Sequence, residues 1–382
     1  MKSTFVTIFP VAQNVHLIKD VGQVGNSIAA TGAYDAKLVC FKNSEAYSLQ
    51  KTEATHLNIE FLEPCGKHLF MEKAVLNYIE KEAKNIDVIH FFHLTKETIY
   101  YALHYKKHHP EGKIYLKMDV YNEMLEEGIR YSKKALFNWY HKQKEKQFFK
   151  VVTAISAENP KSVELLRRKY PLLNDKAFLL TNGVNDSFLK QHFPSVKPFT
   201  EKENIILSVG RIGAEEKNYE MLLNSFVKSG IKDWKLVLVG PIENEFDVKV
   251  KEIIAANPDF KENIILTGAI EDRVELYEYY NRSKIFCLTS PFESFGIAFV
   301  EAMYFGNYII GTTGMSSFNY ISNNMELGRK IEVGDEEGLT ILMGKTVTNT
   351  NFLEEVYLKA QQQVKDKFYW SEIIKSLEEA LK

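Results

Sequence analysis

Short apolar runs alternate with longer amphipathic stretches along the whole chain. Runs rich in Val, Ile, Leu and Phe predict buried strands at Phe5–Phe9, Lys37–Phe41, Val88–Phe92, Lys113–Met118, Val151–Ile155, Ala177–Leu180, Ile205–Val209, Lys235–Val239, Ile264–Thr267, Ile285–Leu288 and Tyr308–Gly311. Stretches with apolar residues every three to four positions predict helices, among them Leu69–Glu82, Glu97–Tyr105, Tyr219–Val227, Val274–Asn281 and Ile297–Phe305. This alternation occurs in both halves of the chain, so we expect an α/β protein with two doubly wound, Rossmann-like domains and parallel sheets.

The two series of strands are separated by the segment Lys190–Asn204, which holds two prolines and which we interpret as a linker. We therefore expect an N-terminal domain over residues 1–195 and a C-terminal domain over residues 196–365. Residues 366–382 predict a helix that folds back on the N-terminal domain. Ligands of parallel sheets bind at the carboxyl ends of the strands, so a cleft between the domains is the expected site.

Length and composition fit this organisation. The 382 residues are enough for two domains with cores of their own, and the 45% hydrophobic and 26% charged residues are ordinary for a globular protein. No apolar run approaches the roughly 18 residues of a membrane span. The first residues, MKSTFVTIFP, lack the features of a signal peptide and are interpreted as a strand. The three cysteines are widely spaced and predict reduced thiols without a zinc site, which favours a cytoplasmic protein.

Charge is distributed unevenly. The net charge of −2 is the sum of about +6 over residues 1–195 and about −8 over residues 196–382. A basic N-terminal half favours an anionic surface or acceptor. A solvated pattern without functional meaning is an equal alternative.

The segment SPFESFGIAFVEAMYFGNYIIGT, residues 290–312, carries the strongest chemical signal. Glu293 follows a predicted strand, Gly296 opens a predicted helix, and Glu301 lies about one turn into that helix. The start of a helix offers free N–H groups and a partial positive charge that suit a phosphate. A carboxylate further along can accept hydrogen bonds from two sugar hydroxyls.

This segment resembles the E-x7-E signature of family four retaining glycosyltransferases, which have the GT-B fold. Three further stretches resemble the same family: SVGRIGAEEKNYEMLLNSF at 208–226, LVLVGP at 236–241 and LTGAIEDRVELYEYYNRSKIFCLTSPFESFG at 266–296. The resemblance covers residues 205–325 and is looser in the N-terminal half. It implies a nucleotide-sugar donor site in the C-terminal domain.

By that resemblance, Arg211 and Lys217 bind the donor diphosphate. Two cations stabilise the charge that develops on a diphosphate leaving group, so such a site works without a metal ion. The sequence has no Asp-x-Asp motif, which agrees with a metal-independent reaction. Ordinary surface charge is the alternative for both cations.

The resemblance also assigns the rest of the donor site. Glu301 binds the ribose hydroxyls, and Glu293 faces the transferred sugar, with a helix-capping carboxylate as its alternative. Backbone groups at Ser294, Phe295 and Gly296 help to orient the sugar. Ile270 lies in a loop that contacts the nucleotide base, for which uridine is the commonest choice among relatives.

The N-terminal half offers weaker signals. Gly22 and Gly25 follow the first strand and are candidates for a phosphate-facing turn, with a plain turn as the alternative. His93 lies just past the end of a predicted strand, where the resemblance places residues near the acceptor, although a structural histidine is favoured for any single position. Lys117 and Asp119 lie on one side of another strand end, either as acceptor-side residues or as a structural ion pair.

Residues 130–150 combine seven basic residues with six interleaved aromatics. A basic, aromatic helix can lie on an anionic membrane surface, as a peripheral enzyme with a lipid-linked acceptor at the inner face of a membrane requires. The alternative is a helix whose aromatics pack inward. No nucleic-acid-binding module is present, which argues against a nucleic-acid partner.

Taken together, the sequence predicts a retaining hexosyltransferase that uses a nucleotide sugar, with UDP expected, and an acceptor hydroxyl of a glycan, lipid-linked sugar or protein. Two alternatives use the same fold: a nucleotide-sugar epimerase or phosphorylase, and a non-catalytic subunit that binds a partner or a glycan. The presence of both cations and both glutamates favours transfer.

Overall fold

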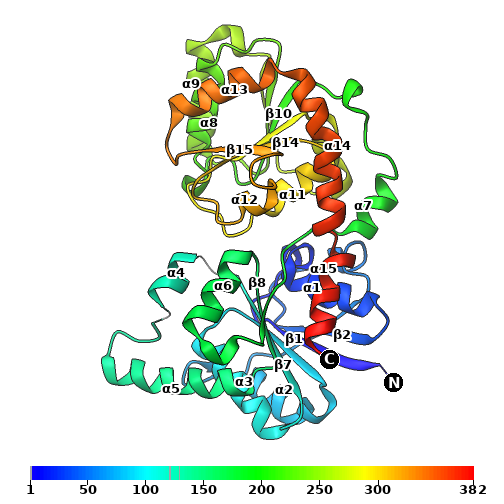
Figure 1. The fold of residues 1–382 in the computed structure, drawn as a ribbon, viewed down its shortest axis with the longest axis vertical. Coiled ribbons are helices and arrows are strands. Elements are labelled where there is room, and N and C mark those ends of the chain that lie inside the picture. Colours follow the sequence, from blue (N-terminus) through cyan, green and yellow to red (C-terminus); the bar gives the residue numbers. More distant parts are fainter. Residues whose placement is uncertain (1, 120–121, 129) are drawn as a thin grey trace. The chain divides into compact units, whose positions relative to one another are not determined.

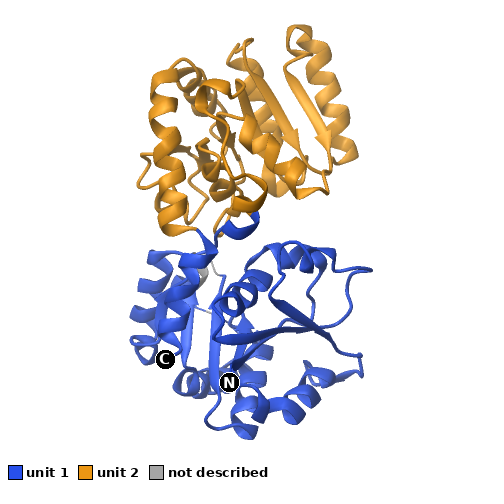
Figure 2. Ribbon diagram, turned by 90° about the vertical axis from the view of Figure 1, so that its right-hand side faces the viewer, with its two compact units in different colours: residues 1–188, 369–382 blue, residues 189–368 orange. Residues whose placement is uncertain are grey.

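The computed structural model describes residues 2–119, 122–128 and 130–382, which form two compact units (Figures 1 and 2). Unit 1 comprises residues 1–188 and 369–382, and unit 2 comprises residues 189–368. The chain therefore passes from one unit to the other twice, first between Phe188 and Leu189 and again between Phe368 and Tyr369.

Unit 1 is built on a seven-stranded sheet with the order β3-β2-β1-β6-β7-β8-β9, in which every neighbouring pair is parallel. The strands are β1 Ser3–Ile8, β2 Tyr34–Cys40, β3 Leu57–Phe61, β6 Val88–Phe92, β7 Lys113–Met118, β8 Ala154–Ala157 and β9 Ala177–Leu179. The helices are α1 Asp20–Ala30, α2 Lys73–Glu82, α3 Lys96–His108, α4 Asn122–Glu127, α5 Ala135–Val151, α6 Pro160–Lys169, and α15 Trp370–Ala380. Helix α7, Asp186–His192, spans the first passage between the units.

Successive strand residues of unit 1 point to opposite faces of the sheet and form two separate cores. Phe5, Val88 and Tyr115 pack with α1 and α15 on one face. Val6 and Ile89 pack with α2, α3, α5 and α6 on the other. Helices on both faces explain why the strands of this sheet are almost continuously apolar.

Unit 2 contains a six-stranded parallel sheet with the order β12-β11-β10-β13-β14-β15. Its strands are β10 Ile205–Val209, β11 Lys235–Val239, β12 Ile264–Gly268, β13 Ile285–Cys287, β14 Tyr308–Thr312 and β15 Gly328–Ile331. Its helices are α8 Tyr219–Lys228, α9 Asn244–Ala256, α10 Arg273–Arg282, α11 Ile297–Tyr304, α12 Phe318–Ile321, α13 Glu336–Val347 and α14 Thr350–Lys367. The predicted α/β class with two Rossmann-like sheets is confirmed.

Two predicted elements have different bounds. The strand expected at Val151–Ile155 begins only at Ala154, because Val151 still belongs to α5. The helix expected from Leu69 begins at Lys73, because a two-stranded hairpin, β4 Lys67–His68 and β5 Met71–Glu72, precedes it. Leu69 sits in the turn of that hairpin with a φ of 58°, which a helix does not allow.

None of the helices in the described part of the chain has the length and apolar character that crossing a bilayer requires. The three cysteines are free; Cys40 and Cys287 are buried, and Cys65 is exposed.

Candidate functional site

The loops after β10 and β13 form the centre of the candidate site in unit 2. These two strands are neighbours in the sheet, so their carboxyl ends bring residues 210–218 and 288–296 together. Ligands bind at such ends where the strand order reverses direction, and in this sheet the order reverses between β10 and β13.

An ion pair joins the two loops. Lys217 Nζ contacts Glu293 Oε1, and the two side chains are only about one-fifth exposed, at 22% and 19%. The Ser290 hydroxyl donates a hydrogen bond to the same carboxylate oxygen at 3.1 Å. Thr289 Oγ1 donates to the carbonyl oxygens of Lys217 and Asn218, at 3.1 and 2.8 Å, and so fixes one loop against the other. The structure therefore brings together two of the three residues predicted to be catalytic.

The backbone around Glu293 is fixed by the turn that follows β14. Glu293 N donates to the carbonyl of Gly314 at 3.3 Å, and Ser316 N donates to the carbonyl of Glu293 at 3.2 Å. A Cβ atom on Gly314 would overlap the carbonyl oxygen of Pro291, so the close approach requires glycine. The backbone of Glu293 is thus held from both sides.

Arg211 follows β10 directly and is the most accessible of the predicted cations. Its side chain is 66% exposed and forms an ion pair with Glu216. The backbone before it runs close to the loop after β11, since a Cβ atom on Gly240 would overlap the carbonyl oxygen of Gly210. A guanidinium group paired with an exposed carboxylate can exchange that partner for another anion at small cost.

Helix α11 starts directly after this loop. Gly296 has a φ of 87°, a left-handed conformation that favours glycine, and is the N-cap of α11. The Phe295 side chain is buried against Phe368, so only its backbone remains for a ligand. The Ser294 carbonyl accepts a hydrogen bond from Ser317 Oγ at 3.0 Å. The arrangement offers the free N–H groups of the α11 N-terminus to an anion.

Glu301 lies on α11 and is held by residues that sequence reasoning did not identify. Its Oε1 atom pairs with Arg273 Nη2 at 2.9 Å and accepts a hydrogen bond from the Tyr277 hydroxyl at 3.0 Å. The Tyr280 hydroxyl donates to Oε2 at 3.2 Å. Burial, followed by the charge of Glu301, raises the pKa of Tyr280 well above its ordinary value, so this hydroxyl remains a donor. The sequence does carry a signal for these residues: Arg273, Tyr277 and Tyr280 are spaced at i, i+4 and i+7 and so lie on one face of α10.

Ile270 lies two residues after β12 and is partly exposed. Gly268, at the end of that strand, has a φ of 77°, and its carbonyl accepts a hydrogen bond from Gly240 N at 3.0 Å. The loops after β11 and β12 are therefore tied together, next to the loop that carries Arg211.

In unit 1, Lys117 is the centre of a buried charged cluster. It is fully buried at the end of β7, where Nζ lies 3.0 Å from Glu158 Oε1 and 3.2 Å from Asp20 Oδ2. Asn182 Nδ2 donates to the same Glu158 oxygen at 2.6 Å. Although burial alone lowers the pKa of Lys117, the two carboxylates raise it overall, so the ammonium stays charged. The charge partners of Lys117 are these two carboxylates, and Asp119 lies partly exposed just beyond the strand.

His93 and His90 occupy different environments at the neighbouring strand β6. His93 follows the strand, is partly exposed, and has a φ of 57°, a conformation that costs energy for a residue with a side chain. His90 is fully buried, stacks on Tyr115, and shares a hydrogen bond of 2.9 Å with Thr7 Oγ1. Burial lowers the pKa of His90 well below its ordinary value, so it is a neutral core residue.

The prediction of a glycine turn at Gly22 and Gly25 is wrong. Both residues lie inside α1 and are buried. A Cβ atom on Gly22 would overlap the backbone of Leu17, and one on Gly25 would lie 2.8 Å from Leu57 Cδ1. The glycines allow α1 to pack closely against the preceding loop and the sheet, which explains their presence without a phosphate.

Comparison with known proteins identifies the second half of the chain. Residues 190–363 match the family of glycosyl transferases group 1. The matched segment has 174 of the 382 residues, a little under half of the chain. The resemblance to family four glycosyltransferases is thereby confirmed, and the group 1 domain contains Arg211, Lys217, Glu293 and Glu301.

One curated relative of this chain is GalNAc-α-(1→4)-GalNAc-α-(1→3)-diNAcBac-PP-undecaprenol α-1,4-N-acetyl-D-galactosaminyltransferase of Campylobacter jejuni. It is 27% identical over 171 residues, which are 44% of this chain and 45% of that protein. The matches span less than half the length of the curated relatives.

Solved structures share the fold over nearly the entire chain. Sucrose-phosphate synthase of Thermosynechococcus elongatus has a TM-score of 0.69 at 16% identity and covers 99% of this chain and 98% of its own. The HepE protein of Anabaena, solved in complex with UDP, has a TM-score of 0.70 at 14% identity and covers 100% of this chain and 99% of its own. The predicted GT-B fold is confirmed.

Outside the group 1 domain, helix α5 presents an apolar surface. Its second half buries Phe148 and Phe149, whereas its first half leaves Trp139 60% exposed. A cavity of about 610 Å³, here called the aromatic pocket, is lined by Leu69, Phe70, Tyr100, Leu136, Phe137, Trp139, Tyr140 and His141. The alternative that all aromatics of residues 130–150 pack inward is therefore wrong for the first half of α5.

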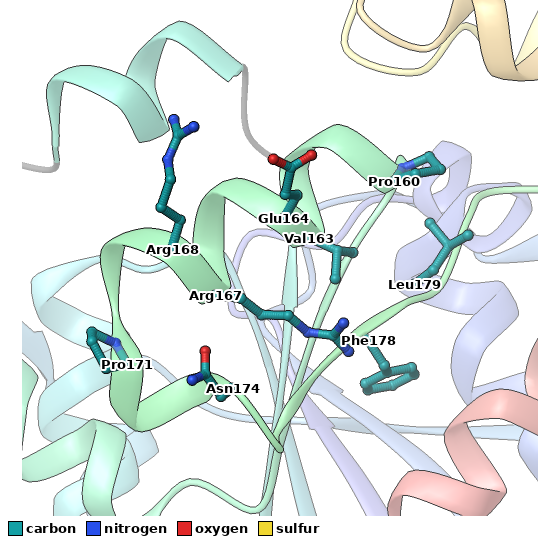
Figure 3. A pocket seen from close by; sticks show the side chains of 9 residues that line it. All are labelled: Pro160, Val163, Glu164, Arg167, Arg168, Pro171, Asn174, Phe178 and Leu179. Carbon is teal, nitrogen blue, oxygen red and sulfur yellow. The ribbon is translucent and has the colours of Figure 1, made fainter.

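A second hollow lies between α6 and β9 in unit 1 (Figure 3). Its volume is about 690 Å³, and its lining includes Pro160, Arg167 and Phe178. The Arg167 guanidinium donates two hydrogen bonds to the carbonyl of Ala177, at 3.2 and 2.6 Å, and is thus used to hold the end of the sheet.

Proposed function

We propose that this protein is a retaining glycosyltransferase that transfers a hexose-type sugar from a UDP-sugar to an acceptor hydroxyl in glycan or polysaccharide biosynthesis. The observation that carries the proposal is the Lys217–Glu293 pair at the carboxyl ends of β10 and β13, with Arg211 on the same loop as Lys217. The group 1 family match supports the reaction class. The UDP bound to HepE supports the nucleotide.

The two cations stabilise the leaving group. As the bond to the sugar breaks, negative charge develops on the diphosphate, and preorganised cations lower the barrier to that step. The diphosphate displaces Glu216 from Arg211 and competes with Glu293 for Lys217. Because both cations are supplied by the protein, transfer proceeds without a metal ion, and we expect a chelator to leave turnover unchanged.

When the diphosphate takes Glu293's place at Lys217, the Glu293 carboxylate becomes available to the sugar. Once Lys217 contacts the diphosphate, the Glu293 carboxylate accepts hydrogen bonds from sugar hydroxyls, while the N–H groups at the start of α11 assist. The leaving phosphate takes the acceptor proton on the face from which it departs, so configuration is retained. Glu301, held by Arg273, Tyr277 and Tyr280, binds the ribose hydroxyls.

Unit 1 is proposed to bind the acceptor. His93 and Asp119 are partly exposed and lie at the carboxyl edge of its sheet. Lys117 is a positioning residue, because it is fully buried between Asp20 and Glu158. The name of the Campylobacter relative includes an undecaprenyl diphosphate acceptor, which supports a lipid-linked sugar as the acceptor class.

Calorimetry tests the donor site first. UDP, GDP, ADP and their sugars are titrated into the wild type, Arg211→Ala and the control Lys261→Ala, which removes an exposed cation of the same unit. UDP binding that weakens about 10- to 100-fold in Arg211→Ala, and stays unchanged in the control, supports the proposal, since hydrogen bonds to charged groups contribute about 1.5–3 kcal/mol. Folded protein that binds no nucleotide contradicts it and favours a non-catalytic subunit.

We also propose that the aromatic pocket and the lysines of α5 contact an anionic membrane surface. Leu69, Leu136 and Trp139 are exposed together, and Lys133, Lys134 and Lys146 are exposed on the same helix or directly before it. Aromatic side chains insert at the interface while lysines contact anionic headgroups. Such contact would bring a lipid-linked acceptor to unit 1.

Tryptophan fluorescence tests this contact. Trp234 and Trp370 are buried, so a blue shift on adding vesicles reports Trp139. We expect the shift with vesicles of phosphatidylcholine and phosphatidylglycerol, a weaker one at high salt, and none with phosphatidylcholine alone. Leu136→Ser should lower the affinity for vesicles, measured by sedimentation, about tenfold, because burying one large apolar side chain contributes about 1.5–3 kcal/mol. The exposed control Leu358→Ser should leave this affinity unchanged. Equal binding by both variants contradicts the proposal.

A further inference from the structure

Two histidines and a glutamate meet where α2 and α3 pack together in unit 1 (Figure 1). His104 and His108 are four residues apart on α3, so both side chains project from one face of the helix. Their ring centroids are 4.7 Å apart. Glu80, on the last turns of α2, faces them, and one ligand atom from each of the three residues lies within 4.8 Å of the others.

The His104 ring is prepared for a ligand. Its Nε2 atom is buried and has no hydrogen-bond partner among the described residues. An imidazole nitrogen without a hydrogen-bond partner can coordinate a metal ion when it is unprotonated. A buried nitrogen without a partner costs free energy that a bound ion would recover.

The residue types of the cluster fit a metal ion, because histidine nitrogens and carboxylate oxygens are common protein ligands of transition ions. Two imidazoles with one carboxylate form a three-ligand set that suits Zn²⁺ and related divalent transition ions.

We propose that Glu80, His104 and His108 form a binding site for a divalent transition ion of the Zn²⁺ class, with a remaining coordination position open to water. The ion would join the C-terminal turns of α2 and α3. In a parallel sheet the crossover helices end at the amino edge, opposite the carboxyl ends that carry His93 and Lys117. The site is therefore separate from the proposed transfer reaction and stabilises unit 1.

Metal binding is measured on the full chain, in a Cys65→Ser background that removes the exposed thiol. The protein is treated with a chelator, dialysed, and titrated with Zn²⁺ by calorimetry and by competition with a chromophoric chelator. We expect one ion per chain and an increase in the melting temperature. His104→Gln should weaken binding by roughly a hundredfold or more, while the control His56→Gln, an exposed histidine of unit 1, should not change it.

Two further readouts decide the outcome if His104→Gln perturbs folding. Glu80 is exposed, so Glu80→Gln should leave circular dichroism unchanged and weaken Zn²⁺ binding at least about tenfold. Co²⁺ bound to the wild type should give the visible absorption of a low-coordinate nitrogen and oxygen site, which His108→Gln abolishes. Folded protein that binds no Zn²⁺, or equal binding by the wild type and Glu80→Gln, overturns the proposal.

Discussion

Glu293 and Glu301, eight positions apart in sequence, differ in how firmly their carboxylates are held by neighbouring side chains. Glu293 shares one oxygen between a lysine and a serine hydroxyl, in a loop held by the turn after β14. Glu301 has both oxygens engaged by an arginine and two buried tyrosines. The first can change partners when an anion arrives, whereas the second is a fixed acceptor.

Glu293→Gln separates sugar orientation from nucleotide binding. We expect UDP affinity to change less than about threefold, because Arg211 and Lys217 remain. Turnover should fall at least about a hundredfold, because a misplaced sugar loses the productive geometry. UDP calorimetry and sugar transfer are measured on the same preparations, with the exposed Glu275→Gln on α10 as the control. A matching loss of UDP affinity would show that Glu293 binds the nucleotide instead.

Lys202 makes the stability of unit 2 depend on pH. It is 5% exposed, and its ammonium donates to the carbonyls of Asn281 and Ser283, at 2.7 and 2.9 Å. Burial, assisted by Lys197 and Lys284 and opposed by Glu278, lowers its pKa to about 7. Between that value and the unfolded value of about 10.4, the unfolded chain binds more protons, so the free energy of unfolding rises with pH.

Between pH 7 and pH 9, we expect the free energy of unfolding of the wild type to rise by about 2 kcal/mol relative to that of Lys202→Met. Chemical denaturation followed by a probe in unit 2 measures both proteins at each pH. The difference between them removes the contribution of all other titrating groups. A difference that is constant, or that falls with rising pH, would contradict a lowered pKa.

At the scale of the elements, helix packing determines the structural role of a glycine. Sequence spacing alone placed Gly22 and Gly25 in a turn, because two glycines after a strand are typical of phosphate loops. The structure continues the helix through both, and the space each leaves is filled by Leu17 or Leu57. A local pattern holds no information about which distant side chain occupies that space.

Gly22→Ala should destabilise unit 1 by about 1–3 kcal/mol, because its Cβ would overlap the backbone of Leu17. Gly344, in the interior of α13, provides the matched control, since a Cβ there meets no atom within 4 Å. Gly344→Ala should stabilise unit 2 by about 0.5–1 kcal/mol, as alanine favours a helix. Urea unfolding distinguishes the two, and a neutral Gly22→Ala would mean that α1 shifts to accommodate the methyl group.

The sequence predicts those parts of the fold whose signal is local. The strands at Val88–Phe92 and Ile205–Val209 have the predicted bounds, because apolar runs buried on both faces are visible along the chain. β3 and β15 were missed, since edge strands are short and partly polar. In the candidate site of unit 2, the motif residues were identified, whereas Arg273 and Tyr277 were not, because their contacts with Glu301 depend on α10 packing against α11.

At the scale of the whole molecule, the last helix completes the first unit. α15 packs beside α1, and it buries Trp370, Ile374 and Leu377 in the core that also contains Phe5 and Val24 (Figure 1). Trp370 N donates to the carbonyl of Val184 at 3.1 Å, and Ser371 Oγ donates to Asp186 Oδ2 at 2.9 Å. Unit 1 therefore depends on residues that follow unit 2 in the sequence.

Leu377→Ala should destabilise unit 1 by about 2–5 kcal/mol, the cost of a cavity in a packed core. UDP binding by unit 2 should stay within about twofold of the wild type at a temperature where both units are folded. Differential scanning calorimetry with and without UDP measures both effects, and the exposed Lys375→Ala on the same helix is the control. Equal destabilisation of the UDP-sensitive transition would mean that the units do not unfold separately.

Because the chain passes from unit 1 to unit 2 and back again, the two units are completed in a fixed order during translation. All of residues 189–368 are synthesised before α15, so unit 2 can fold while one of the two helices on the α1 face of the unit 1 sheet is still absent. Until α15 is made, the core that contains Phe5 and Val24 lacks Trp370, Ile374 and Leu377, and incompletely buried apolar surface is prone to aggregation. The nascent chain thus completes unit 2 before α15 completes the core of unit 1.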